Sequence, residues 1–230
     1  MKTIGLLGGM SWESTIPYYR VVNQTVKEKL GGLHSAKIVL YSVDFFEVER
    51  MQSSGDWDGA GRLLGAAAQR LQAAGADFIV LCTNTMHKVA PAIEAAVTIP
   101  LLHIADPTAS AIKVAGFRTV GLLGTKFTME QAFYLDQLKD HHDLDVLVPP
   151  EEERNTVHRV IYEELCLGQI LPESRDAYRA IIAKLVARGA QAIILGCTEI
   201  SLLVTQSDSE VPLFDTTYLH AQSAAEFALL

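Results

Sequence analysis

The sequence predicts an α/β protein built from two related halves, and three observations support this prediction. Short apolar runs rich in β-branched residues alternate with longer segments of helical period, a pattern typical of parallel sheets with crossover helices. Segments of the first half recur, in the same order, in the second half. The chain has 230 residues, 49% of them hydrophobic, which is enough for a sizeable core in one large domain or two small ones.

Seven apolar runs predict strands, at residues 3–7, 36–43, 78–82, 100–104, 119–123, 192–195 and 211–214. Between them, the segments 60–74 and 174–188 are rich in Ala, Leu and Arg and predict helices. Gly75 and Gly189 directly follow these two segments. Glycine is favoured in the left-handed conformation that ends a helix, so both helices should end there.

The internal repeat divides the chain. The matched pairs are Gly5 with Gly121, Gly75 with Gly189, and Pro100 with Pro212, separated by 116, 114 and 112 residues. Three matches in one order predict a first half over residues 1–105, completed by a C-terminal helix over 216–230, and a second half over 106–215. We expect the halves to be related by a pseudo-twofold axis, with mostly parallel sheets and a ligand-binding cleft between them at the carboxyl ends of the strands.

Composition excludes several classes of partner. A net charge of −8 and a pI near 5.3 argue against nucleic acid and anionic membranes, because both attract basic surfaces. No apolar run approaches the roughly 20 residues that cross a bilayer, and the N-terminal residues are typical of a buried strand rather than a signal peptide. Three widely spaced cysteines favour free thiols in a reducing cytoplasm, without metal-ligand spacing. We therefore expect a cytoplasmic protein with no metal ion.

The repeat also identifies a candidate catalytic pair. With the offset of 114, Cys197 corresponds to Thr83; the next two pairs are Asn84 with Thr198 and Thr85 with Glu199. Each triplet follows an apolar strand and precedes a helical segment, so its backbone N–H groups and hydroxyls can hold a carboxylate. Equivalent groups on opposite faces of one molecule suit racemisation, in which one group removes a proton and the other delivers one. Cysteine suits this task because a helix N-terminus or a cation can lower its pKa from about 8.5 towards neutrality.

Further candidates follow the first strand and lie in a turn-rich stretch. Met10 and Ser11 come after Gly8-Gly9, which is not a dinucleotide fingerprint because G-x-G-x-x-G is absent. Gln52 falls in a predicted loop, before Ser53-Ser54-Gly55, that could cover the site.

These motifs resemble the aspartate/glutamate racemases, which work without pyridoxal phosphate. The motifs are Gly8-Gly9-Met10, Gly75-Ala76-Asp77-Phe78 leading to Thr83-Asn84-Thr85-Met86-His87, and Gly196-Cys197-Thr198-Glu199. The resemblance spans the whole chain and is greatest to the broad-specificity and L-aspartate/glutamate-specific members. It implies a cofactor-independent isomerase, an amino-acid substrate and a homodimer. It also implies that Cys197 faces the L-enantiomer, and it makes substrate-binding candidates of Met10, Ser11, Gln52, Asn84, Thr85, Thr198 and Glu199.

The sequence departs from the family pattern at two places. Thr83 stands where the family has a cysteine, and Cys82, one place early, should face the other side of the strand as a small buried hydrophobe. Cys166 stands near the place of a lysine that grips the side-chain carboxylate of aspartate in the family, which leaves Arg50 as the nearest basic candidate in the first half. We therefore expect a wide substrate range that includes homoserine.

Two other functions stay open. One is a related cysteine-dependent isomerase or decarboxylase of carboxylic acids, since a fold does not fix its chemistry. The other is a non-catalytic amino-acid-binding protein, which would bind without exchanging the α-proton.

Overall fold

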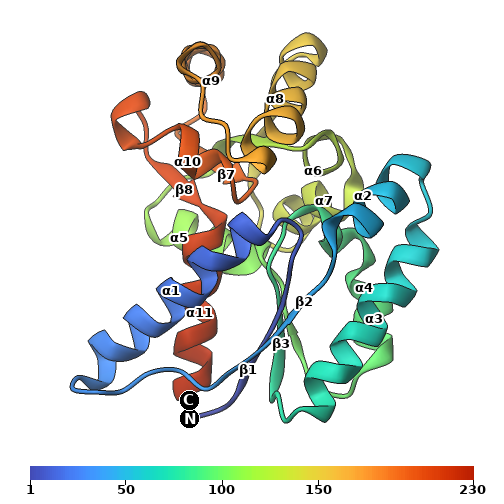
Figure 1. Cartoon of the computed structure of the whole chain (residues 1–230). Coiled ribbons are helices and arrows are strands. Elements are labelled where there is room, and N and C mark those ends of the chain that lie inside the picture. Colours follow the sequence, from blue (N-terminus) through green and yellow to red (C-terminus); the bar gives the residue numbers. More distant parts are fainter. The chain divides into compact units, whose positions relative to one another are not determined.

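The computed structural model describes all 230 residues, which form two compact units (Figure 1). Unit 1 comprises Met1–Ile104 and His220–Leu230, and unit 2 comprises Ala105–Leu219. The chain thus passes from one unit to the other at residues 104–105 and again at 219–220. None of the helices combines the length and the apolar character that a membrane span requires.

Unit 1 contains a sheet of four parallel strands in the order β2-β1-β3-β4. The strands are β1 (Ile4–Gly8), β2 (Ile38–Ser42), β3 (Phe78–Leu81) and β4 (Leu101–Leu102). Because all four run in the same direction, the residues that follow them lie along one edge of the sheet.

Helices cover both faces of this sheet (Figure 1). On one face, α1 (Trp12–Leu30) and the end of α11 (Thr216–Leu229) pack against β1 and β3. On the other face lie α3 (Trp57–Ala73) and α4 (Ala90–Ala96). The remaining elements of unit 1 are α2 (Phe45–Ser54) and the short 3₁₀ helix η1 (Thr85–Val89). Coverage of both faces explains why the strands are continuous apolar runs rather than alternating ones.

Side chains along β3 alternate between the two faces of the sheet. Phe78 and Val80 pack on the α1 and α11 side, whereas Ile79 and Leu81 pack on the α3 side. Cys82 continues the first set and is fully buried with it. Cys82 is therefore a core residue, as the one-residue shift predicts.

Unit 2 repeats this arrangement with four parallel strands in the order β6-β5-β7-β8. The strands are β5 (Thr119–Gly124), β6 (Asp145–Leu147), β7 (Ala192–Gly196) and β8 (Leu213–Asp215). The helices are α5 (Ala105–Val114), α6 (Lys126–Glu130), α7 (Ala132–Asp140), α8 (Glu151–Glu163), α9 (Pro172–Ala187) and α10 (Ile200–Leu203), with the 3₁₀ helices η2 (Leu165–Leu167) and η3 (Gln206–Asp208). The two parallel sheets with flanking helices confirm the predicted α/β fold, and the common strand order gives the sequence repeat its structural meaning.

Glycines end the two long predicted helices. Gly75 after α3 has φ +92°, and Gly189 after α9 has φ +102°, conformations that L side chains rarely adopt. At the end of β1, Gly9 has φ +96°, and a Cβ there would lie 2.6 Å from the Val43 nitrogen. Only glycine lets the chain turn there, directly before Met10 and Ser11.

Candidate active site

The strand order identifies one expected ligand-binding position in each unit, at the carboxyl ends of the two central strands. In unit 1 the chain leaves β1 for β2 on one side and then returns to β3 on the other, so the connections diverge at the carboxyl ends of β1 and β3. Open α/β sheets bind ligands at such a switch point. Residues 9–11 and 83–85 follow these two strands, and in unit 2 residues 125–127 and 197–199 follow β5 and β7. Thr83 and Cys197 therefore each lie at the switch point of their own sheet.

In unit 2, Cys197 forms a pair with the carboxylate two residues further on. The Cys197 side chain is 9% exposed, and its Sγ donates to Oε2 of Glu199 at 3.0 Å. The hydroxyl of Thr198 donates to the same oxygen at 2.5 Å. Cys166, just after α8, donates from its Sγ to the other oxygen, Oε1, at 3.8 Å. One buried carboxylate thus accepts from two thiols and one hydroxyl.

These surroundings hold Cys197 in its protonated form. Burial raises the pKa of its thiol well above the usual value, and the negative charge of Glu199 and then Cys166 raise it further. The pKa of Cys197 is thus raised, and neither of the features that can lower a cysteine's pKa, a cation or a long helix N-terminus, acts on it here. The nearest charged partner is an anion, and the helix that follows, α10, has only four residues.

A second layer of buried polar groups lies nearby in unit 2. The hydroxyl of Tyr178, in α9, donates to the carbonyl oxygen of Val157 at 3.0 Å. Burial, followed by the charge of Cys197, raises the pKa of Tyr178. Glu164 accepts from Ser174 at 2.5 Å and from Arg159 at 3.0 Å. The sequence did not mark Tyr178, because a tyrosine on a helical face is ordinarily a core residue.

In unit 1, the main chain of Thr83 is fixed on both sides. Its N–H donates to the carbonyl oxygen of Leu81 at 2.9 Å, which closes a tight turn at the end of β3. Its own carbonyl oxygen accepts from Nδ1 of His87 at 2.8 Å. Thr83 is 8% exposed, and Asn84 and Thr85 beside it are also buried. Asn84 stands at the N-cap position of η1, yet its side chain makes no capping hydrogen bond.

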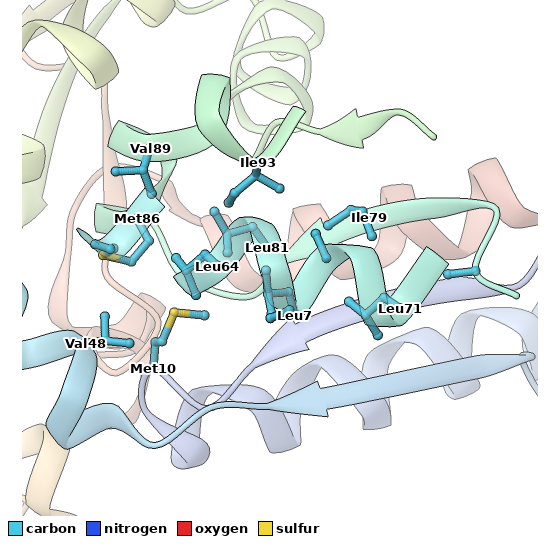
Figure 2. Packing of buried hydrophobic residues seen from close by; sticks show 14 residues of the cluster. Leu7, Met10, Val48, Leu64, Leu71, Ile79, Leu81, Met86, Val89 and Ile93 are labelled. Atoms are coloured by element: carbon cyan, nitrogen blue, oxygen red, sulfur yellow. The ribbon is translucent and has the colours of Figure 1, made fainter. Parts of the chain in front are cut away.

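The other candidates of unit 1 lie in or beside the hydrophobic core. Figure 2 shows Met10 with Val48 and Met86 at one end of the cluster that also contains Leu64. Gln52 was predicted to lie in a loop, but the helix α2 extends to Ser54, and the buried amide of Gln52 donates to the Met86 sulfur at 2.9 Å.

Ser11 is the N-cap residue of α1, and its carbonyl oxygen, rather than its side chain, forms the hydrogen bonds with the first turn. Its carbonyl oxygen accepts from the hydroxyls of Ser14 at 2.7 Å and Thr15 at 3.1 Å. The Thr15 hydroxyl in turn accepts from the N–H of Gly9 at 2.9 Å, which ties the turn after β1 to the first turn of α1.

Neither a buried arginine nor a metal-binding cluster accompanies these residues. Arg50 is exposed, and its guanidinium carbon lies 5.9 Å from the centroid of the Phe46 ring. No set of three or more His, Cys, Asp or Glu side chains is gathered closely enough to hold a metal ion.

His87 gives unit 1 an acid-sensitive element. Its ring is buried, and burial, followed by the nearby rings of His103 and His220, lowers its pKa well below the usual 6.5. A folded-state pKa below the unfolded value means that unfolding takes up a proton as the pH falls below about 6.5. The free energy of unfolding should therefore decrease with falling pH, by up to about 1.4 kcal/mol per pH unit for this group. Urea titrations between pH 7.5 and 5.5 measure this slope.

The matched variants are His87→Gln and His34→Gln, since His34 is an exposed histidine of the same unit. We expect the slope to flatten in the first variant and to stay unchanged in the second. An unchanged slope in both variants would assign the acid sensitivity to another group.

Comparison with known proteins identifies the family of the chain. Residues 7–224 match the family model described as Asp/Glu/Hydantoin racemase. A broad-specificity amino-acid racemase of Bacillus subtilis is 25% identical over 224 residues, covering 96% of this chain and 95% of the relative. A Yersinia pestis protein provisionally described as an Asp/Glu racemase has a TM-score of 0.93 at 61% identity, with full coverage of both chains. An aspartate racemase homologue from Pyrococcus horikoshii has a TM-score of 0.85 at 35% identity, again with full coverage. The chain therefore belongs to the Asp/Glu/hydantoin racemase family.

Proposed function

We propose that the protein is an amino-acid racemase that works without pyridoxal phosphate, with Cys197 and Thr83 as its two proton-transfer groups. The observation that carries the proposal is the hydrogen-bonded pair of Cys197 and Glu199 at the switch point of one sheet, with Thr83 at the equivalent point of the other. Membership of the racemase family supports the same conclusion. By the resemblance stated above, we also expect a homodimer.

On the L-face, the proton of the Cys197 thiol passes to Oε2 of Glu199, which already accepts a hydrogen bond from it at 3.0 Å. The thiolate then removes the α-proton of the L-amino acid. The positive α-ammonium group of a bound substrate would favour the thiolate, because an opposite charge lowers the pKa of a thiol. The substrate's positive charge thus offsets the burial and the negative charge that raise the pKa of Cys197 in the unliganded protein.

On the opposite face, the carbanion takes a proton from the Thr83 hydroxyl, through a water molecule, and becomes the D-amino acid. Glu199 then releases its proton to solvent, and solvent restores the proton of the Thr83 hydroxyl, so that Cys197, Glu199 and Thr83 return to their starting states. A threonine hydroxyl is a far weaker acid than a thiol, so this face is the slower one. Enantiomers have equal free energy in solution, so kcat/KM is the same in both directions, and the asymmetry appears only in kcat and KM separately.

The proposed substrate range follows from the residues that would receive the side chain of the substrate. Cys166, in place of a lysine, contacts Glu199 and brings no positive charge. We propose that aspartate and glutamate are accepted together with neutral amino acids such as homoserine. The breadth stated for the B. subtilis relative supports this range.

The test uses purified protein freed of pyridoxal phosphate and a panel of single L-amino acids that includes aspartate, glutamate and homoserine. Chiral chromatography follows the D-isomers, and incubation in heavy water follows α-hydrogen exchange. D-product from at least one substrate is expected. Exchange without inversion in any substrate would favour a related enzyme, and saturable binding without exchange would favour an amino-acid-binding protein.

Replacing Thr83 with cysteine should raise turnover, because a thiol of pKa about 8.5 replaces a hydroxyl that is a much weaker acid. We expect kcat to increase by about tenfold or more for the best substrate, which is less than the roughly 10²- to 10⁴-fold that a positioned acid–base group contributes, because the hydroxyl already supplies part of that effect. The measurement is kcat for both enantiomers, with circular dichroism as the check on folding. An unchanged kcat in a correctly folded variant would remove Thr83 from the proposed role.

A further inference from the structure

His87 joins the ends of two neighbouring strands of unit 1 behind Thr83. Its Nδ1 contacts the carbonyl oxygen of Thr83 at 2.8 Å, and its Nε2 contacts the N–H of Ile104 at 3.2 Å. A carbonyl oxygen can only accept and a backbone N–H can only donate, so the ring is neutral with its proton on Nδ1. The side chain is 2% exposed, and both of its nitrogens are used by main-chain groups.

A second histidine supports the same strand end from α11. Nε2 of His220 donates to the carbonyl oxygen of Leu102, the last residue of β4, at 3.0 Å. Nδ1 of His220 then accepts from the hydroxyl of Tyr18, in α1, at 2.9 Å. The rings of His220 and His103 lie against His87 edge-on, with centroids 6.0 Å and 4.4 Å away. Protonating His87 would therefore break its bond to Ile104 and place a charge among imidazoles.

Unit 2 has no equivalent of the two hydrogen bonds by which His87 links Thr83 to Ile104. The offset of 114 pairs His87 with Ser201, whose hydroxyl donates to Thr198 at 3.2 Å and not to Cys197. The Cys197 carbonyl oxygen accepts only a backbone bond, from the N–H of Ile200 at 3.2 Å, among the hydrogen bonds of this structure. The histidine is therefore found beside the Thr83 hydroxyl of unit 1 and not beside the Cys197 thiol of unit 2. Proton transfer depends on the position of the acting group, so a fixed main chain at Thr83 bears directly on where its hydroxyl lies.

We propose that His87 is a positioning residue, which holds the main chain of Thr83 so that its hydroxyl can protonate the carbanion. The proposal rests on the proposed role of Thr83. It predicts a specific defect: losing the bond to Thr83 impairs delivery of the second proton and leaves removal of the first by Cys197 intact. A general loss of stability would instead lower both steps together.

Two substitutions separate the two nitrogens of the ring. In His87→Asn, the amide nitrogen stands at the place of Nδ1 and can still donate to Thr83, but nothing reaches Ile104. In His87→Gln, the amide oxygen stands at the place of Nε2 and can still accept from Ile104, but the donor to Thr83 is lost. Thr83→Val, which removes the hydroxyl and keeps the shape, is the reference for a missing second proton donor.

The measurement is made in heavy water, on the L-amino acid that the wild-type enzyme converts fastest in the panel above. Mass spectrometry gives deuterium in the remaining L-isomer, and chiral chromatography gives the D-isomer. We expect His87→Gln to lower inversion relative to exchange by about 10- to 100-fold, the effect of a misplaced group, as Thr83→Val does. His87→Asn should keep the ratio within about threefold of wild type.

The remaining outcomes contradict either the positioning role of His87 or the proposed function on which it rests. An unchanged ratio in His87→Gln, with Thr83→Val altered, overturns the positioning role alone. Equal loss of exchange and inversion in both His87 variants also overturns it, because the role is then only structural. An unchanged ratio in Thr83→Val removes the basis of the inference, and a wild-type protein with neither exchange nor inversion refutes the racemase itself.

Discussion

The Cys197→Ala variant should form no D-isomer from any L-amino acid that the wild-type protein racemises. A positioned proton-transfer group contributes about 10²- to 10⁴-fold, and the alanine side chain has no group that could take the α-proton. Exchange of the α-hydrogen of L-substrates should disappear as well, since Cys197 removes that proton. Chiral chromatography and exchange in heavy water measure the two losses.

The matched control is Cys82→Ala, which removes a thiol of the other unit. Cys82 is fully buried in the core, its Sγ donates a hydrogen bond to the carbonyl oxygen of Val80 at 3.6 Å, and burial raises its pKa. We expect this variant to lose about 1 kcal/mol of stability and to keep its racemase activity. Activity of Cys197→Ala within tenfold of wild type would exclude Cys197 as the base.

Much of the fold could be predicted because parallel strands covered on both faces are visible as apolar runs. Seven of the eight strands were predicted in this way, and the internal repeat indicated two similar sheets. The strand β6 was missed. It has only three residues at the edge of its sheet, none of them fully buried, so it lacks the continuous apolar run of the central strands.

The site was predictable where it depends on chain position and not where it depends on distant packing. The offset of 114 in the internal repeat pairs Thr83 with Cys197, and each of them follows a central strand of its own sheet. The helix α2 was missed around Gln52 because Ser53-Ser54-Gly55 is typical of a turn, whereas Gly55, at φ +75°, in fact ends the helix. The nearness of Glu199 to Cys197 in the sequence hinted at a raised pKa, but the largest cause is burial and a third is Cys166, and both depend on packing that the sequence does not show.

Replacing Glu199 with glutamine should lower the pKa of Cys197 and at the same time slow racemisation. The amide keeps the shape of the side chain, but it removes the negative charge that raises the pKa of the thiol. The pKa should fall because the like charge that opposes ionisation of the thiol is gone. Turnover should nevertheless fall by about 10²- to 10⁴-fold, because the amide cannot take the thiol proton.

The pKa is measured as the pH midpoint of iodoacetamide alkylation at Cys197, read by mass spectrometry of its peptide, and turnover by chiral chromatography. The control is Glu163→Gln, which removes the same charge from a side chain of unit 2 that is 67% exposed. It should change neither quantity. A lower midpoint with unchanged or faster turnover in Glu199→Gln would mean that the carboxylate only opposes ionisation of the thiol. A lower midpoint with slower turnover is the result expected if Glu199 accepts the thiol proton. The thiolate of Cys197 would then form at lower pH, yet the reaction would be slower because the amide cannot take the proton.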